Sequence, residues 1–422
     1  MQWLNRAMLK LLIVNILDRE EKIMAEWIVT NLEECTDVLG DGLHGTPKYT
    51  ENGEYAFVNG NNLVEGEILI KKETKRVDYS QYEKYKKPLT DRTILVSING
   101  TLGNVGVYDS EKIILGKSAC YFNVKQSVDK DFIYYVVSSP VFRQYLENNA
   151  TGTTIKNISL KQMREYTFSI PQIDEQKKIS SVLRKIDEKI KNNKAINNNL
   201  LEQAQAIFKS WFIDFEPFDN SMPLDWTKGT IDDLAKEIVC GKTPSTKKVE
   251  YYGSDIPFIT IPDMHKKIYT VTTERYLSKL GANSQARKSL PKNSVCVSCI
   301  GTAGLVTLVA EESQTNQQIN SIIPKDSFSS YYIYLLMQTL SETINKLGQS
   351  GSTIVNLNKS QFGKIQVNIP TLSTMTKFDE TVFPVFERIL QNEKENLNLT
   401  SLRDTLLPKL MSGELDISNI DI

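Results

Sequence analysis

Apolar residues between positions 179 and 211 recur at alternating intervals of four and three, the heptad spacing of a helix that buries one narrow stripe. Two asparagines interrupt this seam. Its positions are Ile179, Leu183, Ile186, Ile190, Asn193, Asn197, Leu200, Ala204, Ile207 and Trp211. At about 1.5 Å per residue the helix would reach roughly 50 Å. The pattern therefore predicts one long helix packed against another.

The same seam returns 199 residues later (378 − 179), and this identifies the partner helix. Its positions are Phe378, Val382, Val385, Ile389, Asn392, Asn396, Leu399, Arg403, Leu406 and Leu410. Both asparagines recur, and Arg403 in place of Ala204 is the clearest departure. Because a polar seam residue fixes register and partner choice at a cost in stability, we expect the two helices to pack in one alignment. Pro384 is expected to kink this helix or lie in its first turns, and Pro408 to end or bend it.

The repeat extends beyond the helices. Ordered matches lie at shifts between 197 and 201 residues, which indicates a tandem duplication. They include Trp27 with Trp226, Thr46-Pro47 with Thr243-Pro244, Ser97 with Ser298, Thr101 with Thr302, and Thr151–Thr154 with Ser350–Thr353. Each copy is predicted to be a mixed α/β head followed by a long helix. The expected fold is thus α+β, with two similar heads separated by two long antiparallel coiled-coil helices and related by a pseudo-twofold axis, one head at each end.

Local patterns place elements within each head. Alternating β-branched and aromatic runs predict strands at 94–97, 105–108 and 319–323. Residues 131–149 are expected to be helical with a break near Pro140, and residues 330–347 to form a helix closed by Gly348.

Composition narrows the function classes. A net charge of −1 over 422 residues gives no general attraction to nucleic acid or membrane, so any electrostatic footprint must be local. The five cysteines form no secreted disulfide framework, which favours a reducing cytoplasm. No apolar run approaches the length of a membrane span. We interpret residues 1–23 as a frayed helix, or as sequence upstream of a natural start at Met24, rather than as a signal peptide.

Catalytic machinery is sparse. The two histidines supply neither a triad nor a His-based metal cluster. Cys296 and Cys299 have CxxC spacing but no second pair, so buried strand cysteines are the favoured interpretation. Gly116-Lys117-Ser118 resembles the end of a P-loop, yet Glu111 stands in place of its first glycine. We expect no active site, no metal site and no bound cofactor in this chain.

Two kinds of segment suit phosphate contact in both copies. Glycine beside hydroxyl residues lets backbone N–H groups approach a phosphate, although such loops can equally be turns that shape the fold. Lysines interleaved with tyrosines suit DNA, although a charge run is commonly a solvated surface. The candidate DNA-binding residues are Lys48, Tyr49, Lys71, Lys72, Lys75, Arg76, Ser97, Thr101, Gly152, Thr153, Thr154, Lys156, Lys242, Thr243, Ser245, Lys247, Lys248, Lys266, Lys267, Thr302, Gly351, Ser352 and Thr353.

These motifs together resemble the specificity subunit of a type I restriction–modification system, over nearly the whole chain. The resemblance includes the two-unit plan, the Gly-x-Thr-Pro turns and the Ser-x-x-Gly-Thr-x-Gly loops. It also includes the Ile-Pro-x-x-x-x-Gln176 helix entry and the helix endings at 206–215 and 403–414. Residues 371–375 depart from the usual entry to the second helix, which leaves its start open.

The resemblance implies two target-recognition domains that each read half of a bipartite double-stranded DNA site, with the helices setting the gap. It implies two modification subunits, carrying S-adenosylmethionine and methylating adenine, and restriction subunits using ATP and Mg. The expected divisions are 1–23, a recognition domain at 24–171, a helix and linker at 172–218, a second recognition domain at 219–370, a helix at 371–412 and a tail at 413–422. The alternatives are a scaffold that spaces two protein-binding domains and a stand-alone nuclease.

Overall fold

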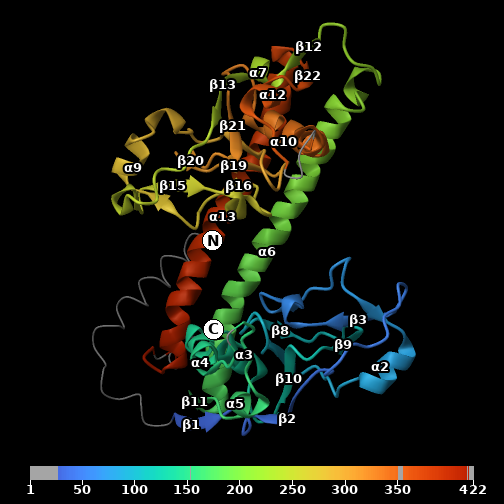
Figure 1. Cartoon of the computed structure of the whole chain (residues 1–422), viewed down its shortest axis with the longest axis vertical. Helices are drawn as coiled ribbons and strands as arrows, with labels where there is room; N and C mark the ends of the chain where they lie inside the picture. The colour runs from blue at the N-terminus through green and yellow to red at the C-terminus, as the bar shows by residue number, and fades with distance from the viewer. Residues whose placement is uncertain (1–26, 153, 350–354, 416, 418–422) are drawn as a thin grey trace. The chain divides into compact units, whose positions relative to one another are not determined.

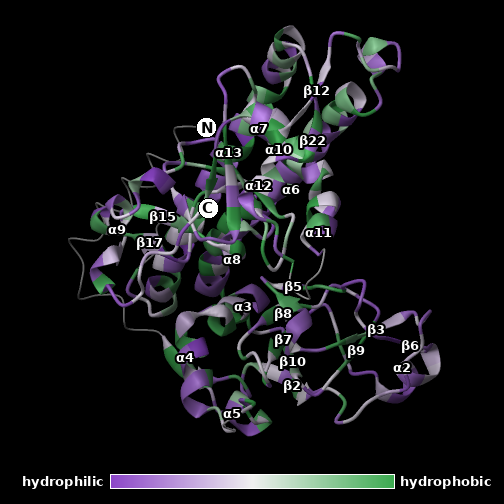
Figure 2. Cartoon of the chain, turned by 45° about the horizontal axis from the view of Figure 1, so that its top comes forward, coloured by the Kyte–Doolittle hydropathy of each residue, from purple (hydrophilic) through white to green (hydrophobic). Residues whose placement is uncertain are grey.

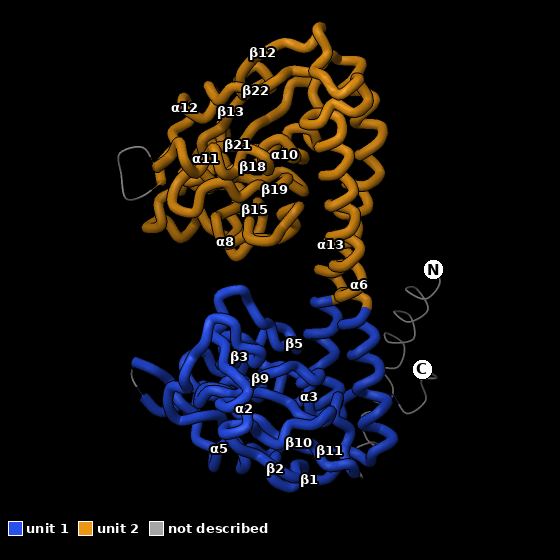
Figure 3. The backbone as a smooth tube through the Cα atoms, turned by 90° about the vertical axis from the view of Figure 1, so that its right-hand side faces the viewer, with its two compact units in different colours: residues 1–188, 400–422 blue, residues 189–399 orange. Residues whose placement is uncertain are grey.

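The computed structural model describes residues 27–152, 154–349, 355–415 and 417. The chain divides into two compact units, one formed by residues 1–188 with 400–422 and the other by residues 189–399 (Figure 3). We call these unit 1 and unit 2. Each unit contains one head and a stretch of both long helices.

The two long helices are α6, Ile173–Phe212, and α13, Leu372–Met411, of 40 residues each (Figure 1). They pack antiparallel in each unit. In unit 1 Asp187 contacts Arg403, and in unit 2 Asn197 bonds Asn392 and the ring of Phe208 lies 6.2 Å from that of Phe378. The long-helix prediction is confirmed.

Local contacts distinguish the first turns of α6 and α13, and two prolines lie within α13. Pro384 lies in the helix interior with its side chain exposed, and α13 ends three residues after Pro408. At the start of α6 the buried Gln176 side chain accepts from the Asp129 N–H at 2.9 Å and donates to the Pro171 carbonyl at 2.8 Å. The equivalent residue of α13 is Met375, which is buried, so an apolar contact replaces this polar link.

Head 1, the globular part of unit 1, has a four-stranded sheet in the order β2-β10-β7-β8 and a three-stranded sheet in the order β6-β3-β9. The predicted strands at 94–97 and 105–108 are confirmed as β7 and β8, and the predicted break at Pro140 separates α3 from α4. The elements are β1 Ile28–Asn31, β2 Thr36–Asp41, β3 Tyr55–Val58, η1 Gly60–Asn62, β4 Leu63–Val64, β5 Glu67–Ile68, β6 Arg76–Val77, α2 Tyr79–Tyr85, β7 Thr93–Ser97, β8 Val105–Val107, β9 Ile113–Leu115, β10 Ala119–Val124, α3 Lys130–Ser138, α4 Pro140–Asn149, α5 Leu160–Arg164 and β11 Thr167–Ile170.

Head 2, the globular part of unit 2, repeats this plan with sheets β13-β21-β18-β19-β16 and β14-β17-β15-β20. The predicted single helix at 330–347 is wrong in one respect, because the chain breaks at Leu340 into α10 and α11. The elements are η2 Glu216–Phe218, β12 Thr227–Thr230, α7 Ile231–Leu234, β13 Ala235–Cys240, η3 Val249–Tyr251, β14 Tyr252–Gly253, β15 Ile256–Ile259, α8 Ile261–Met264, β16 Tyr269–Thr270, β17 Tyr276–Leu277, α9 Lys279–Asn283, η4 Ala286–Lys288, β18 Val295–Ser298, β19 Val306–Val309, β20 Gln314–Thr315, β21 Ile319–Pro324, α10 Ser330–Thr339, α11 Ser341–Gly348, α12 Lys359–Gly363 and β22 Gln366–Ile369.

Strand pairing confirms that the two heads are copies. The central strand of the smaller sheet pairs in parallel with one neighbour, β3 with β9 and β15 with β20. The same strand pairs antiparallel with the other neighbour, β3 with β6 and β15 with β17. Two heads of the same α+β plan, each packed on a pair of long antiparallel helices, agree with the predicted fold class.

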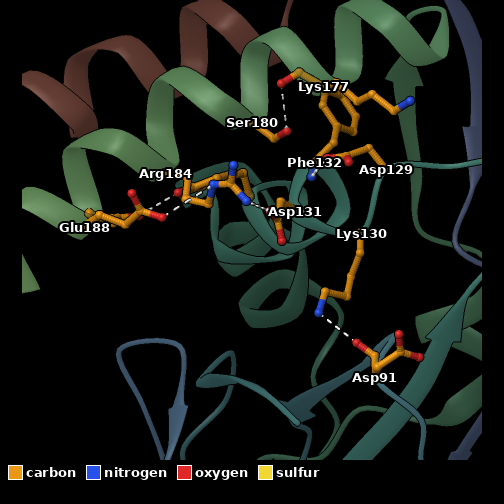
Figure 4. Close-up of polar contacts among 11 residues, drawn as sticks. Asp91, Asp129, Lys130, Asp131, Phe132, Lys177, Ser180, Arg184 and Glu188 are labelled. Carbon is orange, nitrogen blue, oxygen red and sulfur yellow. Dashed lines mark hydrogen bonds and ion pairs between the residues drawn. The ribbon is translucent and has the colours of Figure 1, made fainter. Parts of the chain in front are cut away.

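The seam side chains complete the core of each unit. In unit 1 Ile179 and Leu183 of α6 and Leu406 of α13 lie in one buried cluster with Phe132 of α3. A charged contact also joins the helix to the head, since Arg184 of α6 lies 3.3 Å from Asp131 of α3 (Figure 4).

Hydropathy follows burial within head 1. The strand β7 is hydrophobic and buried, whereas the helix α2 is hydrophilic and has no buried residue (Figure 2).

Candidate nucleic-acid interface

Four loops of head 1 lie in a row that backbone hydrogen bonds connect. Leu43 N–H donates to the Leu115 carbonyl at 2.7 Å, which joins the 41–47 loop to the turn at 115–118. Ile98 N–H donates to the Ser118 carbonyl at 3.0 Å, which joins that turn to the 97–101 loop. Gly100 N–H donates to the Lys156 carbonyl at 2.9 Å, which joins the 151–157 loop. We call these segments the loop row of head 1.

Head 2 builds the same row from equivalent bonds. Lys242 N–H donates to the Thr315 carbonyl at 2.9 Å, Cys299 N–H to the Gln318 carbonyl at 2.8 Å, and Gly301 N–H to the Val355 carbonyl at 3.0 Å. The loop row of head 2 therefore consists of the described parts of segments 240–244, 315–318, 298–302 and 348–356. Segments that are separate in sequence therefore meet in the same order in both heads.

Glycines allow the backbone conformations of these loops. Gly100 and Gly301 have φ angles of 77° and 78°, a region that residues with a Cβ rarely adopt. Gly152 has a φ of 92°, and a Cβ on it would lie 2.3 Å from the Ile155 carbonyl oxygen. The glycine spacing of the motifs is thus required by the turns themselves.

The serines of the Ser-x-x-Gly-Thr loops have a structural role. Ser97 and Ser298 are fully buried, and their hydroxyls accept from the N–H groups of Asn104 at 2.8 Å and Leu305 at 2.9 Å. A hydroxyl that closes a turn beneath the surface has no path to a DNA phosphate. For Ser97 the prediction of a DNA contact is therefore corrected to the alternative, a turn that shapes the fold.

Other predicted side chains lie on the outer face of the row. In head 1 Thr101, Thr154 and Lys156 are exposed, and in head 2 Lys242 and Thr302 are exposed. Thr243 is half-buried and donates to the Gln317 side chain at 2.7 Å. Thr153, Gly351, Ser352 and Thr353 lie outside the described residues.

The row also contains exposed residues that no DNA-binding motif predicts. Lys117 and Gln317 are exposed at equivalent places in the second segment of each row, 115–118 and 315–318. His44 is exposed on the first loop and bonds Asp41 at 2.5 Å. In the sequence Lys117 resembles only part of a P-loop. Aligning the two copies turn by turn would have indicated it as a candidate DNA-binding residue.

The basic and aromatic stretch of head 1 separates into two parts. Lys48 and Tyr49 lie beside Lys75 and Arg76. The N–H of Thr50, the next residue, donates to the Arg76 carbonyl at 2.9 Å. The Tyr49 ring packs 5.7 Å from the ring of Phe57, and the Phe57 N–H donates to the Lys75 carbonyl. Lys48, Tyr49 and Lys75 are exposed, whereas Arg76 is half-buried and donates to two carbonyls at 3.3 Å.

Two other charges of this stretch have internal partners. Lys86 bonds Glu83 at 2.9 Å, and Arg92 donates to three backbone carbonyls. Lys71 and Lys72 are exposed on the short turn before β6.

The basic residues of head 2 fall in two places. Ser245, Lys247 and Lys248 are exposed before η3, and the Lys248 ammonium bonds the Tyr251 hydroxyl at 3.0 Å. Lys266 and Lys267 are exposed on the turn that leads into β16. The same turn is followed by Tyr269, whose N–H donates to Glu393 of α13 at 3.5 Å, so it lies near that helix.

The centre of the helix seam is polar and paired. Asn193 donates to Asn396 at 2.9 Å and to Glu395 at 2.8 Å, and Asn392 donates to Asn197 at 2.8 Å. Both predicted asparagine pairs therefore face each other across the helices of unit 2. All the predicted seam residues are buried or half-buried.

The cysteines have the environment of core residues. Cys296 and Cys299 are buried, and burial raises the pKa of each thiol to about 12. Thiols held protonated in this way are poor metal ligands. Among the described residues there is no group of His, Cys, Asp and Glu side chains suited to a metal ion, and none of the described helices is apolar over a length that would span a bilayer.

Sequence comparison adds independent information. A family model described as the type I restriction modification DNA specificity domain matches residues 24–202 and again residues 223–399. The HindI type I restriction enzyme specificity subunit of Haemophilus influenzae is 33% identical over 68% of this chain and 77% of its own length. The MjaIX specificity subunit of Methanocaldococcus jannaschii is 25% identical over 94% of this chain and 96% of its own length.

Structural comparison agrees on the fold. The crystal structure of the type I restriction–modification S subunit from M. genitalium matches with a TM-score of 0.59 at 20% sequence identity. The match covers 96% of this chain and 99% of that chain.

Proposed function

Because this chain belongs to the type I restriction–modification DNA specificity family, we propose that it is a non-catalytic subunit whose two heads each read one half of a bipartite DNA site. The helix pair sets the unread gap and docks two modification subunits. Those subunits carry S-adenosylmethionine and methylate adenine, and restriction subunits supply the ATP- and Mg-dependent steps.

The observation that carries this proposal is the loop row. It is built by equivalent hydrogen bonds in both heads, yet its side chains differ, because Lys117 and Lys156 of head 1 are replaced in head 2 by Gln317 and the half-buried Val355. A common frame with different surface residues suits two readers of different base sequences, since base edges are distinguished by the side chains presented to them. The exposed lysines suit the phosphates on either side.

The proposal is tested on the complex of this chain with its modification subunits, bound to duplex DNA. Replacing Lys156→Ala removes an exposed ammonium from the loop row. We expect weaker binding to all sequences, a salt dependence whose log–log slope is smaller by about one unit, and an unchanged sequence preference. Titrations at several salt concentrations measure all three.

The matched control is Lys125→Ala in the same head. Lys125 follows the C-terminal end of β10, whereas the loop row joins that strand at its N-terminal end. This variant loses the same charge and should keep the wild-type affinity and slope. Equal effects of the two substitutions would contradict a DNA interface at the loop row.

A further inference from the structure

One layer of the helix pair is chemically different in the two units. α6 and α13 correspond residue by residue after a shift of 199, because they begin at Ile173 and Leu372 and have equal lengths. In unit 1 Asp187 of α6 contacts Arg403 of α13. The equivalent residues in unit 2 are Phe386 (187 + 199) and Ala204 (403 − 199), and both are fully buried in that unit's core.

The layer in unit 1 is an ion pair held by further hydrogen bonds. One Arg403 amino group donates to Asp187 Oδ1 at 2.8 Å, and the Tyr135 hydroxyl of α3 donates to Asp187 Oδ2 at 2.8 Å. Arg403 also donates to Asp404 at 2.9 Å. Burial opposes the charge of Arg403, but its bonds to Asp187 and Asp404 outweigh this effect and raise its pKa. The Asp187 and Arg403 side chains are only 28% and 31% exposed.

The corresponding layer in unit 2 is aromatic. Phe386 stacks on Tyr331 with ring centroids 4.5 Å apart and meets Tyr334 edge-on at 5.6 Å. Ala204 is fully buried in the same cluster as these rings. Neither Phe386 nor Ala204 can balance a charge, so the two layers are not interchangeable.

The asparagines at the centre of the seam cannot make this distinction. Asn193 bonds Asn396 and Asn197 bonds Asn392, and each partner is the shifted equivalent of the other asparagine (396 − 199 = 197 and 392 − 199 = 193). Two copies of α6 packed antiparallel in the same register would therefore again place Asn193 opposite Asn197. The asparagines fix register but accept either helix as a partner.

We propose that the Asp187–Arg403 layer makes α6 select α13 as its partner and reject α6 of a second copy of this chain. Antiparallel pairing of α6 with itself would place Asp187 opposite Ala204, and pairing of α13 with itself would place Arg403 opposite Phe386. Pairing of α6 with itself leaves the partly buried Asp187 without a counter-ion, and pairing of α13 with itself leaves Arg403 with Asp404 of its own helix but without Asp187. Both losses are costly, whereas the native pairing joins Asp187 and Arg403 in one unit. Without this layer the two duplicated helices would be similar enough to replace each other as partners.

A second ion pair along the seam is a weaker discriminator. Lys189 contacts Glu395 at 3.3 Å, and pairing of α6 with itself would lose this contact because the residue equivalent to Glu395 is Ile196. Both side chains of that pair are more than a third exposed, so solvent screens the interaction and it contributes little. The inference concerns the helix pair alone and does not depend on DNA binding by the heads.

The test cuts the folded chain between its two halves and measures which segments then pair with each other. A protease site is placed at the exposed residues 219–220, the folded full-length protein is cut, and the two segments exchange in mild urea. Native mass spectrometry then counts mixed pairs, with one segment of each kind, against like pairs. We expect the wild-type segments to remain almost entirely in mixed pairs.

Neutralising the layer with Asp187→Ala and Arg403→Ala should lower the ratio of mixed to like pairs at least tenfold. The charge-reversed variant Asp187→Arg with Arg403→Asp loses the hydrogen bonds to Tyr135 and Asp404 but keeps opposite charges across the layer, so it should restore part of the mixed pairing. If the alanine variant does not fold, Asp187→Asn with Arg403→Gln removes the charges at nearly constant volume and is measured in the same way.

The matched control is Lys161→Ala with Glu165→Ala, which removes an exposed ion pair of α5 and should leave sorting at the wild-type ratio. The proposal is overturned if wild-type segments form like pairs freely, or if the neutral variant keeps the wild-type ratio. It is also overturned if the charge-reversed variant sorts like the neutral one.

Discussion

At the scale of single residues, the same side-chain chemistry has different roles a few positions apart. Ser97 is buried and closes a turn, while Thr101, four residues later, is exposed on the loop row. The sequence motif predicted a role for this loop in DNA contact but could not tell which of the two hydroxyls is exposed. Hydrogen bonds from residues 97 and 98 to residues 104 and 118 decide which hydroxyl is covered. Lys117 was missed for the same reason, since its place in the row depends on contacts between distant segments.

Glu393 of α13 illustrates a charge that no sequence pattern indicated. Its carboxylate accepts from the Tyr269 N–H at 3.5 Å, and Oε2 is buried with no hydrogen-bond partner in the described part of the chain. Burial raises the pKa of this carboxyl from 4.5 to about 7, although the Tyr269 N–H and Lys267 oppose the shift.

The stability of the protein should therefore fall as the pH rises between 4.5 and 7. Below pH 4.5 the Glu393 carboxyl is protonated in the folded and unfolded states, so it makes no difference. Between the two pKa values only the unfolded chain releases the proton, and above pH 7 the full penalty of about 3 kcal/mol remains. Glu393→Gln should remove this dependence and raise the urea midpoint at pH 8.

The control for this prediction is Glu380→Gln, which neutralises an exposed carboxylate of the same helix. It should keep the wild-type pH profile. A Glu393→Gln protein whose urea midpoint follows the wild-type curve from pH 4.5 to 8 would rule out the assignment.

At the scale of elements, the long helices were predictable because the heptad spacing is a local signal repeated many times. The seam residues, the asparagine pairs and the break at Pro140 all followed from it or from proline chemistry. The break of the 330–347 helix at Leu340 did not, since no proline or glycine marks it. There α11 turns so that Ser341 donates to the Gly304 carbonyl at 2.8 Å, a tertiary contact invisible in the local sequence.

The asparagine pair Asn197–Asn392 should behave as a coupled unit. Asn392→Leu alone leaves the buried Asn197 carbonyl without its donor and should lower the free energy of unfolding by about 1–3 kcal/mol. Replacing both asparagines by leucine removes both polar groups and should cost less than the sum of the single changes. Urea unfolding of the four proteins in a double-mutant cycle measures the coupling, and strictly additive changes would show that the pair does not act together.

At the scale of the whole molecule, the duplication was readable from sequence because equivalent residues recur at nearly constant shifts. The structure confirms it through the matching sheet order and the matching loop rows. The bases that each head reads could not be predicted, because they depend on the positions of individual exposed side chains such as Lys117 and Gln317, which the motif leaves free to vary.

The most direct test of the account is a genome-wide map of methylated adenines in cells that carry this chain with its modification subunits. The account predicts methylation at one asymmetric sequence with two specific halves and an unread gap. Replacing residues 24–171 by the head of a relative should change one half and leave the other half and the gap unchanged. Methylation without sequence preference, or a change in both halves after the exchange, would contradict it.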